Sequence, residues 1–285
     1  MKQTATQNKK WQLRILYVSL GVCIALMAAF AVMIVLELRT TGQGRAFYAT
    51  LSVPVLPRST APPIMPRPAV PLAQPAFPPD ADVYAPGPGE AHVSFVDFDE
   101  KRRQFSNVVA WIQSEGTVIN YPVVQGSDNE FYLYHLADGT RHPMGSIFLD
   151  YRNAADFSCP VILIFGHDMR SGDMFGSLRG YGRQDYFEQH PSMSIFSPYQ
   201  DFELWLIAGF VINSAIEIPP MSFADEGEFY QYIASIRHRS QFVSNIEVSY
   251  GDRLVILATC TPIGPSTYRK LVVGTLVPRV MAITE

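Results

Sequence analysis

From residue 117 onward, hydrophobic residues come in short runs bounded by glycine, proline and polar residues. Runs of this kind predict strands, and the segments that fit are residues 117–125, 144–150, 160–165, 202–212, 247–255 and 271–277. One segment there predicts a helix, Phe223–Arg239, in which Phe229, Ile233 and Ile236 share a face and acidic residues crowd the first turn. Many short strands with few helices predict a β-barrel or sandwich.

The first half of the chain has two further patterns. Residues 95–116 show a rough helical periodicity, which predicts a helix at the start of the folded domain. Residues 15–36 contain no charge and are long enough to cross a bilayer as a helix. A cleaved signal sequence is the alternative. The flanking basic residues are Lys2, Lys9, Lys10 and Arg14 before the span and Arg39 and Arg45 after it. This asymmetry predicts a cytoplasmic N-terminus and an extracellular remainder.

Between the span and the folded domain the chain is rich in proline. Twelve of its 22 prolines fall between Pro54 and Pro88, a density that predicts an extended spacer without helix or sheet. The expected organisation is a cytoplasmic N-terminus (1–14), a transmembrane anchor (15–36), a Pro-rich extracellular linker (37–90) and a catalytic domain (91–285). The linker would hold the domain away from the membrane.

Composition narrows the function classes. The 285 residues are 48% hydrophobic and 17% charged, enough for one sizeable core, and the net charge of −4 gives no indication of nucleic-acid binding. Cys23, Cys159 and Cys260 are too few for a disulfide framework. We therefore expect a remaining thiol of the exported domain to have a chemical task.

Three residues at predicted strand ends carry the candidate chemistry. Cys260 ends the apolar run that begins at Leu254, Arg269 opens the next run, and His167 follows the run that ends at Phe165. If the last two strands pair antiparallel, Cys260 and Arg269 lie near one sheet edge. A thiol, an imidazole and a guanidinium at strand ends indicate thiol acyl transfer, in which the arginine stabilises a developing oxyanion. Taken singly, each also has a structural interpretation, as a buried cysteine, a surface arginine and a structural histidine.

The chain resembles the class B sortases, the membrane-anchored cysteine transpeptidases of Gram-positive surfaces, over about residues 95–279. The resemblance is carried by the order and spacing of WI at 111–112, YPVVQGSDNEFYL at 121–133, GSIFLD at 145–150, FGHDMRSGDMFGSL at 165–178, ATC at 258–260 and YRKLVVGTLV at 268–277. It implies a mainly β fold: an eight-stranded sortase barrel with N-terminal helices and one long helix before the cysteine strand. That helix would be Phe223–Arg239.

The resemblance also implies residue roles. The family's catalytic residues correspond to His167, Cys260 and Arg269. The cysteine would cleave a sorting motif of secreted proteins after a Thr, and an amine of a peptidoglycan precursor or a pilin would accept the acyl group. No cofactor or metal is implied. By similarity, the residues lining the substrate groove would be Asn129, Leu133, Tyr232, Ile233 and Thr259. Two positions depart from the family pattern, Ile256 in place of a Thr and Asp168 in place of a common Asn.

Three alternatives can be compared with this interpretation. A papain-type protease has its Cys before its His in the chain and at a helix start, whereas here His167 precedes Cys260 and Cys260 ends a strand. A non-catalytic tethered adhesion or scaffold domain would need only the stalk and the barrel. A zinc site that uses Cys159, His167 and nearby histidines matches no usual ligand spacing.

Overall fold

The computed structural model describes residues 2–57, 94–260 and 267–279, and the chain divides into two units, Met1–Phe47 and Tyr48–Glu285. The first unit is the larger part of helix α1 (Lys2–Leu51). The stretch Leu16–Leu51 of this helix is long and apolar enough to cross a membrane, with a mean hydropathy of 2.7 over its best window. A signal sequence passes the same test. Helix α1 is thus a candidate membrane span by length and composition.

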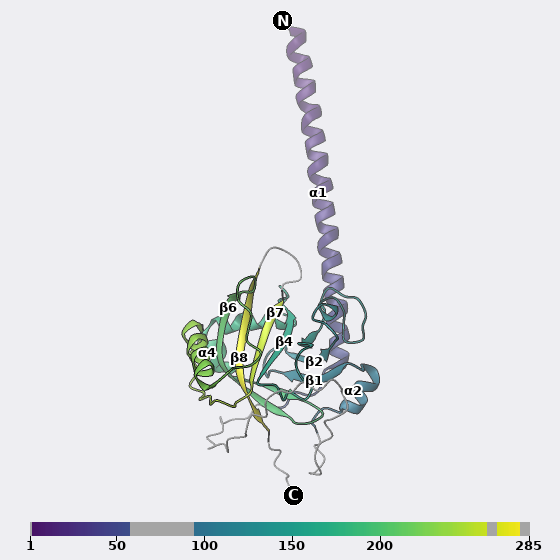
Figure 1. The fold of residues 1–285 in the computed structure, drawn as a ribbon. Coiled ribbons are helices and arrows are strands. Elements are labelled where there is room, and N and C mark those ends of the chain that lie inside the picture. The colour runs from purple at the N-terminus through teal and green to yellow at the C-terminus, as the bar shows by residue number, and fades with distance from the viewer. Residues whose placement is uncertain (1, 58–93, 261–266, 280–285) are drawn as a thin grey trace. The chain divides into compact units, whose positions relative to one another are not determined.

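The second unit is a closed eight-stranded barrel (Figure 1). The strands are β1 (Val108–Gln113), β2 (Asn120–Gln125), β3 (Ile147–Leu149), β4 (Val161–His167), β5 (Ser192–Phe196), β6 (Phe202–Asn213), β7 (Leu254–Cys260) and β8 (Tyr268–Pro278). The helices are α2 (Phe98–Gln104), α3 (Gln184–Gln189) and α4 (Glu226–Arg239), with two 3₁₀ segments, η1 (Phe131–Leu133) and η2 (Phe175–Gly182). The predicted eight-stranded barrel is confirmed.

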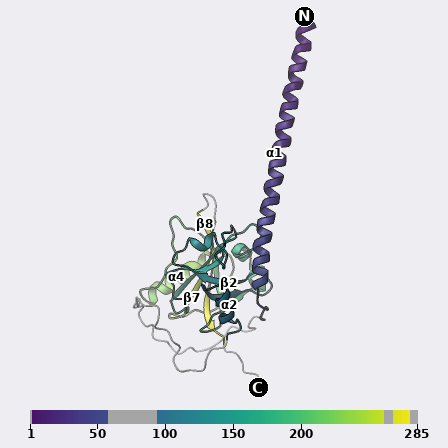
Figure 2. The same ribbon diagram turned by 90° about the vertical axis from the view of Figure 1, so that its right-hand side faces the viewer.

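Strand neighbours follow the order β1-β2-β3-β4-β7-β8-β6-β5, and β5 closes onto β1. Most neighbours pair antiparallel, but β2 with β3 and β4 with β7 are parallel. Figure 2 shows the same barrel after a quarter turn. Because β4 and β7 are parallel neighbours, their carboxyl ends lie at the same end of the barrel. Strand β8 runs antiparallel to β7 and therefore begins at that end.

Two predicted elements differ from the structure, and one strand was not predicted. Residues 95–116 are not one helix, because they form the short α2 and then strand β1. All of β1 is buried, so it lacks the alternation that marks a strand with one face in water. The predicted strand 247–255 begins only at Leu254, and β5 was not predicted. Pro122 lies inside β2, which pairs with β3 only from Val123 onward, so the absent N–H of Pro122 is not needed in that ladder.

The segment predicted as a linker, 37–90, begins inside α1, and its part from Tyr48 to Pro57 belongs to the barrel unit. Side chains of β1 and β2 hold this part by its backbone. Asn120 Nδ2 donates to the carbonyl of Val53 at 2.8 Å, and Gln113 contacts both the Pro54 carbonyl at 3.0 Å and the Leu56 N–H at 2.9 Å. Residues 58–90 of the predicted linker lie outside the described part of the chain.

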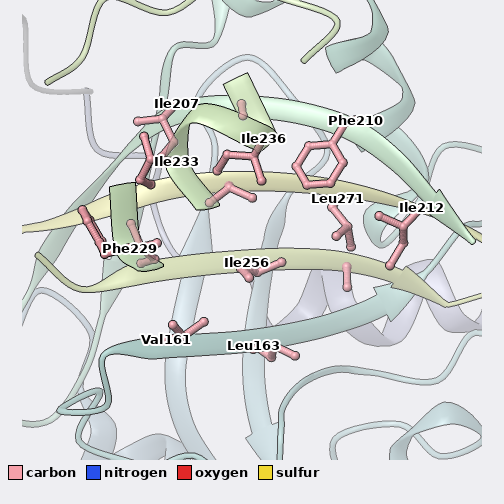
Figure 3. Packing of buried hydrophobic residues seen from close by; sticks show 14 residues of the cluster. Val161, Leu163, Ile207, Phe210, Ile212, Phe229, Ile233, Ile236, Ile256 and Leu271 are labelled. Carbon is pink, nitrogen blue, oxygen red and sulfur yellow. The ribbon is translucent and has the colours of Figure 1, made fainter. Parts of the chain in front are cut away.

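Helix α4 covers one face of the barrel. Its N-terminus is fixed by Asp225, whose side chain accepts from the Glu228 N–H at 2.9 Å, and by Glu228, which reaches back to the Ala224 N–H at 2.6 Å. Its three predicted apolar residues are buried against strands β4, β6, β7 and β8 (Figure 3). The cluster comprises Val161, Leu163, Ile207, Ala208, Phe210, Ile212, Phe229, Ile233, Ile236, Leu254, Ile256, Ala258, Leu271 and Val273.

Candidate active site

The three candidate catalytic positions lie in one row across strands β4, β7 and β8. The parallel ladder pairs His167 with Cys260 as its last step. The antiparallel ladder on the other side of β7 pairs Ala258 with Leu271, and continuing its count by two residues sets Cys260 opposite Arg269. Between these steps the Lys270 N–H donates to Thr259 Oγ1 at 2.9 Å, which holds β8 to the end of β7. The expectation that the last two strands pair antiparallel is confirmed.

This row continues the apolar face that α4 covers. Side chains two residues apart in a strand share a face. Leu163 of β4 belongs to the buried cluster and Phe165 packs against it, so His167 is next on that face. On β8, Leu271 and Val273 belong to the same cluster, and Arg269 precedes them at the same spacing. The site therefore lies where this hydrophobic face reaches the end of the barrel at which β4 and β7 end and β8 begins.

His167 is buried, with 1% of its surface exposed, and its ring contacts the backbone of a distant loop. Its Nε2 is hydrogen-bonded to the carbonyl oxygen of Leu133, at the end of η1. A carbonyl can only accept, so Nε2 must carry a proton. In the neutral ring Nδ1 is then the basic nitrogen, which gives the imidazole one defined tautomer.

The loop that presents Leu133, residues 126–146, is fixed by its own polar side chains. Asp128 accepts from the N–H groups of Glu130 and Phe131, both at 2.8 Å. These bonds, with that of Phe131 the larger, lower the pKa of Asp128. Asn129 donates to Asp150 Oδ2 at 3.0 Å and accepts from the Tyr151 N–H at 3.1 Å. Both ends of the Asn129 amide thus anchor the loop.

The segment after His167 is tied back by an ion pair. Asp168 pairs with Arg179 of η2, whose other terminal nitrogen donates to the Met169 carbonyl at 2.9 Å. Burial raises the pKa of Asp168, and the attraction of Arg179 only partly offsets this effect. Asp168 also forms a β-bridge with Met174, a non-glycine residue with a positive φ of 52°. An Asp at 168 is therefore accommodated by Arg179, a partner that no sequence pattern indicated.

The other predicted groove residues lie in two places. Tyr232 and Ile233 are on α4, where Ile233 is buried in the cluster (Figure 3) and Tyr232 packs at its border beside Phe223. The Tyr232 hydroxyl is buried and has no hydrogen-bond partner among the described residues. Burial raises the pKa of this phenol. Thr259 is buried as well, and its hydroxyl is the acceptor for the Lys270 N–H.

Lys270, next to Arg269, was not predicted from the sequence as part of the site. Its side chain is buried, and Nζ donates to the Tyr181 carbonyl at 3.0 Å and to Gln241 Oε1 at 2.5 Å. Burial lowers the pKa of this amine to about 8. Lys270 thus connects β8 to η2 and to the segment after α4.

Cys159 does not lie near the row. It precedes β4, whereas His167 ends that strand, so the length of β4, roughly 20 Å, lies between them. The Cys159 thiol accepts from the Ala154 N–H at 3.2 Å. Among the described residues, no three His, Cys, Asp or Glu side chains gather in a group that could hold a metal ion.

Comparison with characterised proteins gives one consistent result. Sortase B of Listeria monocytogenes is 33% identical over 154 residues, which are 54% of this chain and 63% of the relative, less than two thirds of its length. Sortase B of Staphylococcus aureus is 26% identical over 176 residues, 62% of this chain and 72% of the relative. No family model matches the chain.

Solved structures agree with these relatives. Sortase B from Listeria monocytogenes is 31% identical and superposes with a TM-score of 0.54, and the match covers 62% of this chain and 97% of that one. A Staphylococcus aureus sortase B–substrate complex is 26% identical with a TM-score of 0.61, covering 64% of this chain and 84% of that one. A sortase B complexed with triglycine is 26% identical with a TM-score of 0.59, over 64% of this chain and 85% of that one.

Proposed function

This chain belongs to the class B sortase family, and from that premise we propose that it is a cysteine transpeptidase. It cleaves a C-terminal sorting motif of secreted proteins after a Thr and transfers the acyl group to an amine. The observation that carries the proposal is the row in which His167 and Cys260 are paired in register, with Arg269 on the next strand. The catalytic roles of these three residues are part of the proposal.

The reaction has two halves. The Cys260 thiolate attacks the carbonyl carbon, a C–S bond forms, and the carbonyl oxygen becomes negative. Arg269 donates hydrogen bonds to that oxygen. Collapse of the intermediate breaks the C–N bond, and His167 gives its proton to the leaving amine. The acceptor amine then attacks the thioester and loses a proton to His167, and the new C–N bond replaces the C–S bond.

This sequence of steps constrains the protonation states. Cysteine must start as a thiolate and histidine as an imidazolium. With ordinary pKa values of about 8.5 and 6.5, each required form is a minority near neutral pH if the two groups titrate independently. The rate should therefore peak between the two pKa values in a bell-shaped profile.

Substrate contacts are proposed at the edge of the face that α4 covers. Tyr232 has a buried hydroxyl that a peptide could engage, and Leu133 lies in contact with His167. Ile233, Asn129 and Thr259 would act as the groove's supporting layer, because their side chains are occupied in the fold. The substrate and triglycine complexes of related sortases support a peptide substrate and an amine acceptor. The proposed acceptor is a peptidoglycan precursor or a pilin.

The proposed location is the cell membrane. Helix α1 would cross once with its N-terminus in the cytoplasm, because more basic residues precede the span than follow it. The barrel would then act outside the cell. Protease added to intact protoplasts should remove the barrel, and protection of the barrel would contradict this orientation.

The proposed activity is tested with a peptide library and an added amine. Mass spectrometry should detect a thioacyl adduct of the chain, followed by release of an amide product. Cys260→Ala should abolish both adduct and product while the fold persists, and Cys159→Ala, the matched control, should leave both unchanged. Product formation by Cys260→Ala would exclude the thiol mechanism. Unaltered surface anchoring in cells that carry this variant would favour a non-catalytic scaffold.

A further inference from the structure

Tyr48, in the last turn of α1, is buried in the barrel unit with 4% of its surface exposed. Its hydroxyl donates to the Gly145 carbonyl at 2.7 Å and lies 3.0 Å from Ser146 Oγ. Its ring meets the ring of Tyr121 edge-on, with centroids 5.3 Å apart. The loop that Tyr48 contacts through its hydroxyl is the same 126–146 loop that presents Leu133.

A first route leads from Tyr48 to His167 through that loop. Ser146 is bonded through its N–H to the Tyr132 carbonyl at 2.9 Å and through its hydroxyl to the His135 carbonyl at 2.9 Å. Gly145 has a φ of 58°, and a Cβ there would stand 2.6 Å from the Leu133 oxygen. The turn at 145–146 is therefore packed directly against the carbonyl that contacts the His167 ring.

A second series of contacts begins at the Tyr48 ring, which packs against Tyr121. The Tyr121 hydroxyl accepts from the Met174 N–H at 3.2 Å. Met174 in turn forms the β-bridge with Asp168, the residue that follows His167. Tyr48 thus contacts one element that orients the histidine ring and another that fixes the backbone just beyond it.

We propose that Tyr48 is a positioning residue for His167, acting through the 145–146 turn and Tyr121. The segment that leads from α1 into the barrel then sets the orientation of the acid–base group. The importance of this orientation for turnover rests on the proposed function, but the orientation itself does not. A residue that acts through another should change tautomer and proton transfer more than substrate binding.

The test uses the full chain in detergent micelles with ¹⁵N-labelled histidine, assigned with His167→Gln. In the wild type, the neutral His167 ring should show the single tautomer protonated on Nε2. Tyr48→Phe keeps the ring and removes the hydroxyl, so the Leu133 carbonyl should hold Nε2 less firmly. We expect a tautomer mixture and a lower His167 pKa, since a lost bond to the imidazolium disfavours that form. In turnover, kcat should fall about threefold to tenfold with KM little changed.

Tyr199→Phe, at a half-exposed tyrosine, is the matched control and should leave the His167 signals as in the wild type. Ser146→Ala disturbs the same turn from the other partner and should shift the signals in the same direction. A His167 tautomer and pKa in Tyr48→Phe that equal those of Tyr199→Phe would overturn the proposal. The titration is repeated in Cys260→Ala, where no turnover is needed. If Tyr48→Phe shifts the His167 signals but the chain with an intact Cys260 shows no transpeptidation, the positioning role is retained and the proposed function is rejected.

Discussion

His167 lies between a strand ladder and an irregular loop, and the two constrain it differently. On the ladder side, β4 pairs with β7 at every residue from Val161 to His167. On the loop side, residues 126–146 contact the ring through the backbone carbonyl of Leu133. The ladder sets where the histidine backbone lies relative to Cys260 and Arg269, and the carbonyl sets which ring nitrogen carries the proton.

Because the ladder and the loop constrain His167 differently, variants on the two sides should have different effects on activity and stability. In the proposed mechanism, changes in the strand row remove a group that acts on the substrate, so kcat should fall while the fold is retained. Changes in the loop or in the segment from Tyr48 to Pro57 should leave those groups in place and disturb their orientation and support. The expected losses are smaller there, and stability should change together with activity.

Among variants that keep the Cys260 thiol, the largest effect is expected at Arg269. Arg269→Lys keeps the charge but loses the planar fork that can donate two bonds to an oxyanion. We expect kcat to fall by about 10²–10³-fold with little change in KM. Arg183→Lys, at an arginine that is highly exposed and paired with Asp185, is the control. Near-normal turnover in Arg269→Lys, measured beside unchanged melting temperatures, would remove Arg269 from the proposed mechanism.

The strand side of this comparison was predictable from the sequence. The run from Leu254 to Cys260 and the run from Val161 are β-branched, apolar and sharply bounded, so both strands and the residues at their ends could be predicted. Strand β1 could not, because burial on both faces removes the alternation that distinguishes a strand from a helix. The start of the barrel unit could not be predicted from the proline-rich sequence. Residues 52–57 are held by hydrogen bonds from side chains of β1 and β2, and their own sequence carries no sign of these contacts.

The loop side was only partly predictable. Leu133 was expected as a groove residue, but its contact with His167 is made by a backbone carbonyl, which every residue type carries. Asn129 was expected to meet substrate, yet its amide is used within the fold. The positions of Tyr48 and Lys270 are set by hydrogen bonds to carbonyls distant in sequence, those of Gly145 and Tyr181, and no local sequence pattern indicates such pairs.

Gly145→Ala is the sharpest test of the loop side. A Cβ at this position meets the carbonyl oxygens of Leu133 and Tyr132 at 2.6 and 2.7 Å, so the backbone around Leu133 must shift. We expect a loss of about 2–4 kcal/mol in unfolding free energy and roughly a tenfold drop in kcat. Gly139 also has a positive φ but no atom within 4 Å of an added Cβ, so Gly139→Ala isolates the backbone strain.

Only Gly145→Ala should alter kcat beyond the loss of folded protein. Urea unfolding and initial rates are measured for both variants at a temperature where each is folded. If the two variants lose activity equally, the approach of Gly145 to the Leu133 carbonyl has no bearing on catalysis.

Removing the segment that leads into the barrel should cost a similar unfolding free energy and have a smaller effect on kcat. A chain that begins at residue 90 lacks Tyr48 and the three backbone contacts to Asn120 and Gln113. At about 1 kcal/mol for each of these three bonds and for the Tyr48 bond to the Gly145 carbonyl, it should be about 4 kcal/mol less stable than a chain that begins at residue 46. Thermal melting and single-turnover acylation of both chains check this. Equal stability and equal rates would mean that the folded enzyme begins near residue 90, as the proline pattern predicts.

The last effect, on stability alone, concerns Lys270, on the ladder side of the comparison. Its pKa of about 8 in the folded chain lies below the usual value near 10.5. Below pH 8 the folded chain carries the buried charge at its full cost. Between about pH 8 and 10.5 the unfolded chain binds more protons than the folded chain, so stability should rise with pH across that interval. Above it both states are neutral and the cost vanishes.

Lys270→Met should remove that rise. Urea unfolding of the chain beginning at residue 46, measured from pH 7 to 10, gives the difference between wild type and variant. Other titrating groups contribute to both chains and cancel in this difference, and Lys101→Met controls for the loss of a lysine as such. A difference that stays flat with pH would mean that Lys270 keeps its ordinary pKa. In that case its bonds to the Tyr181 carbonyl and Gln241, rather than burial, would dominate the end of β8 beside Arg269.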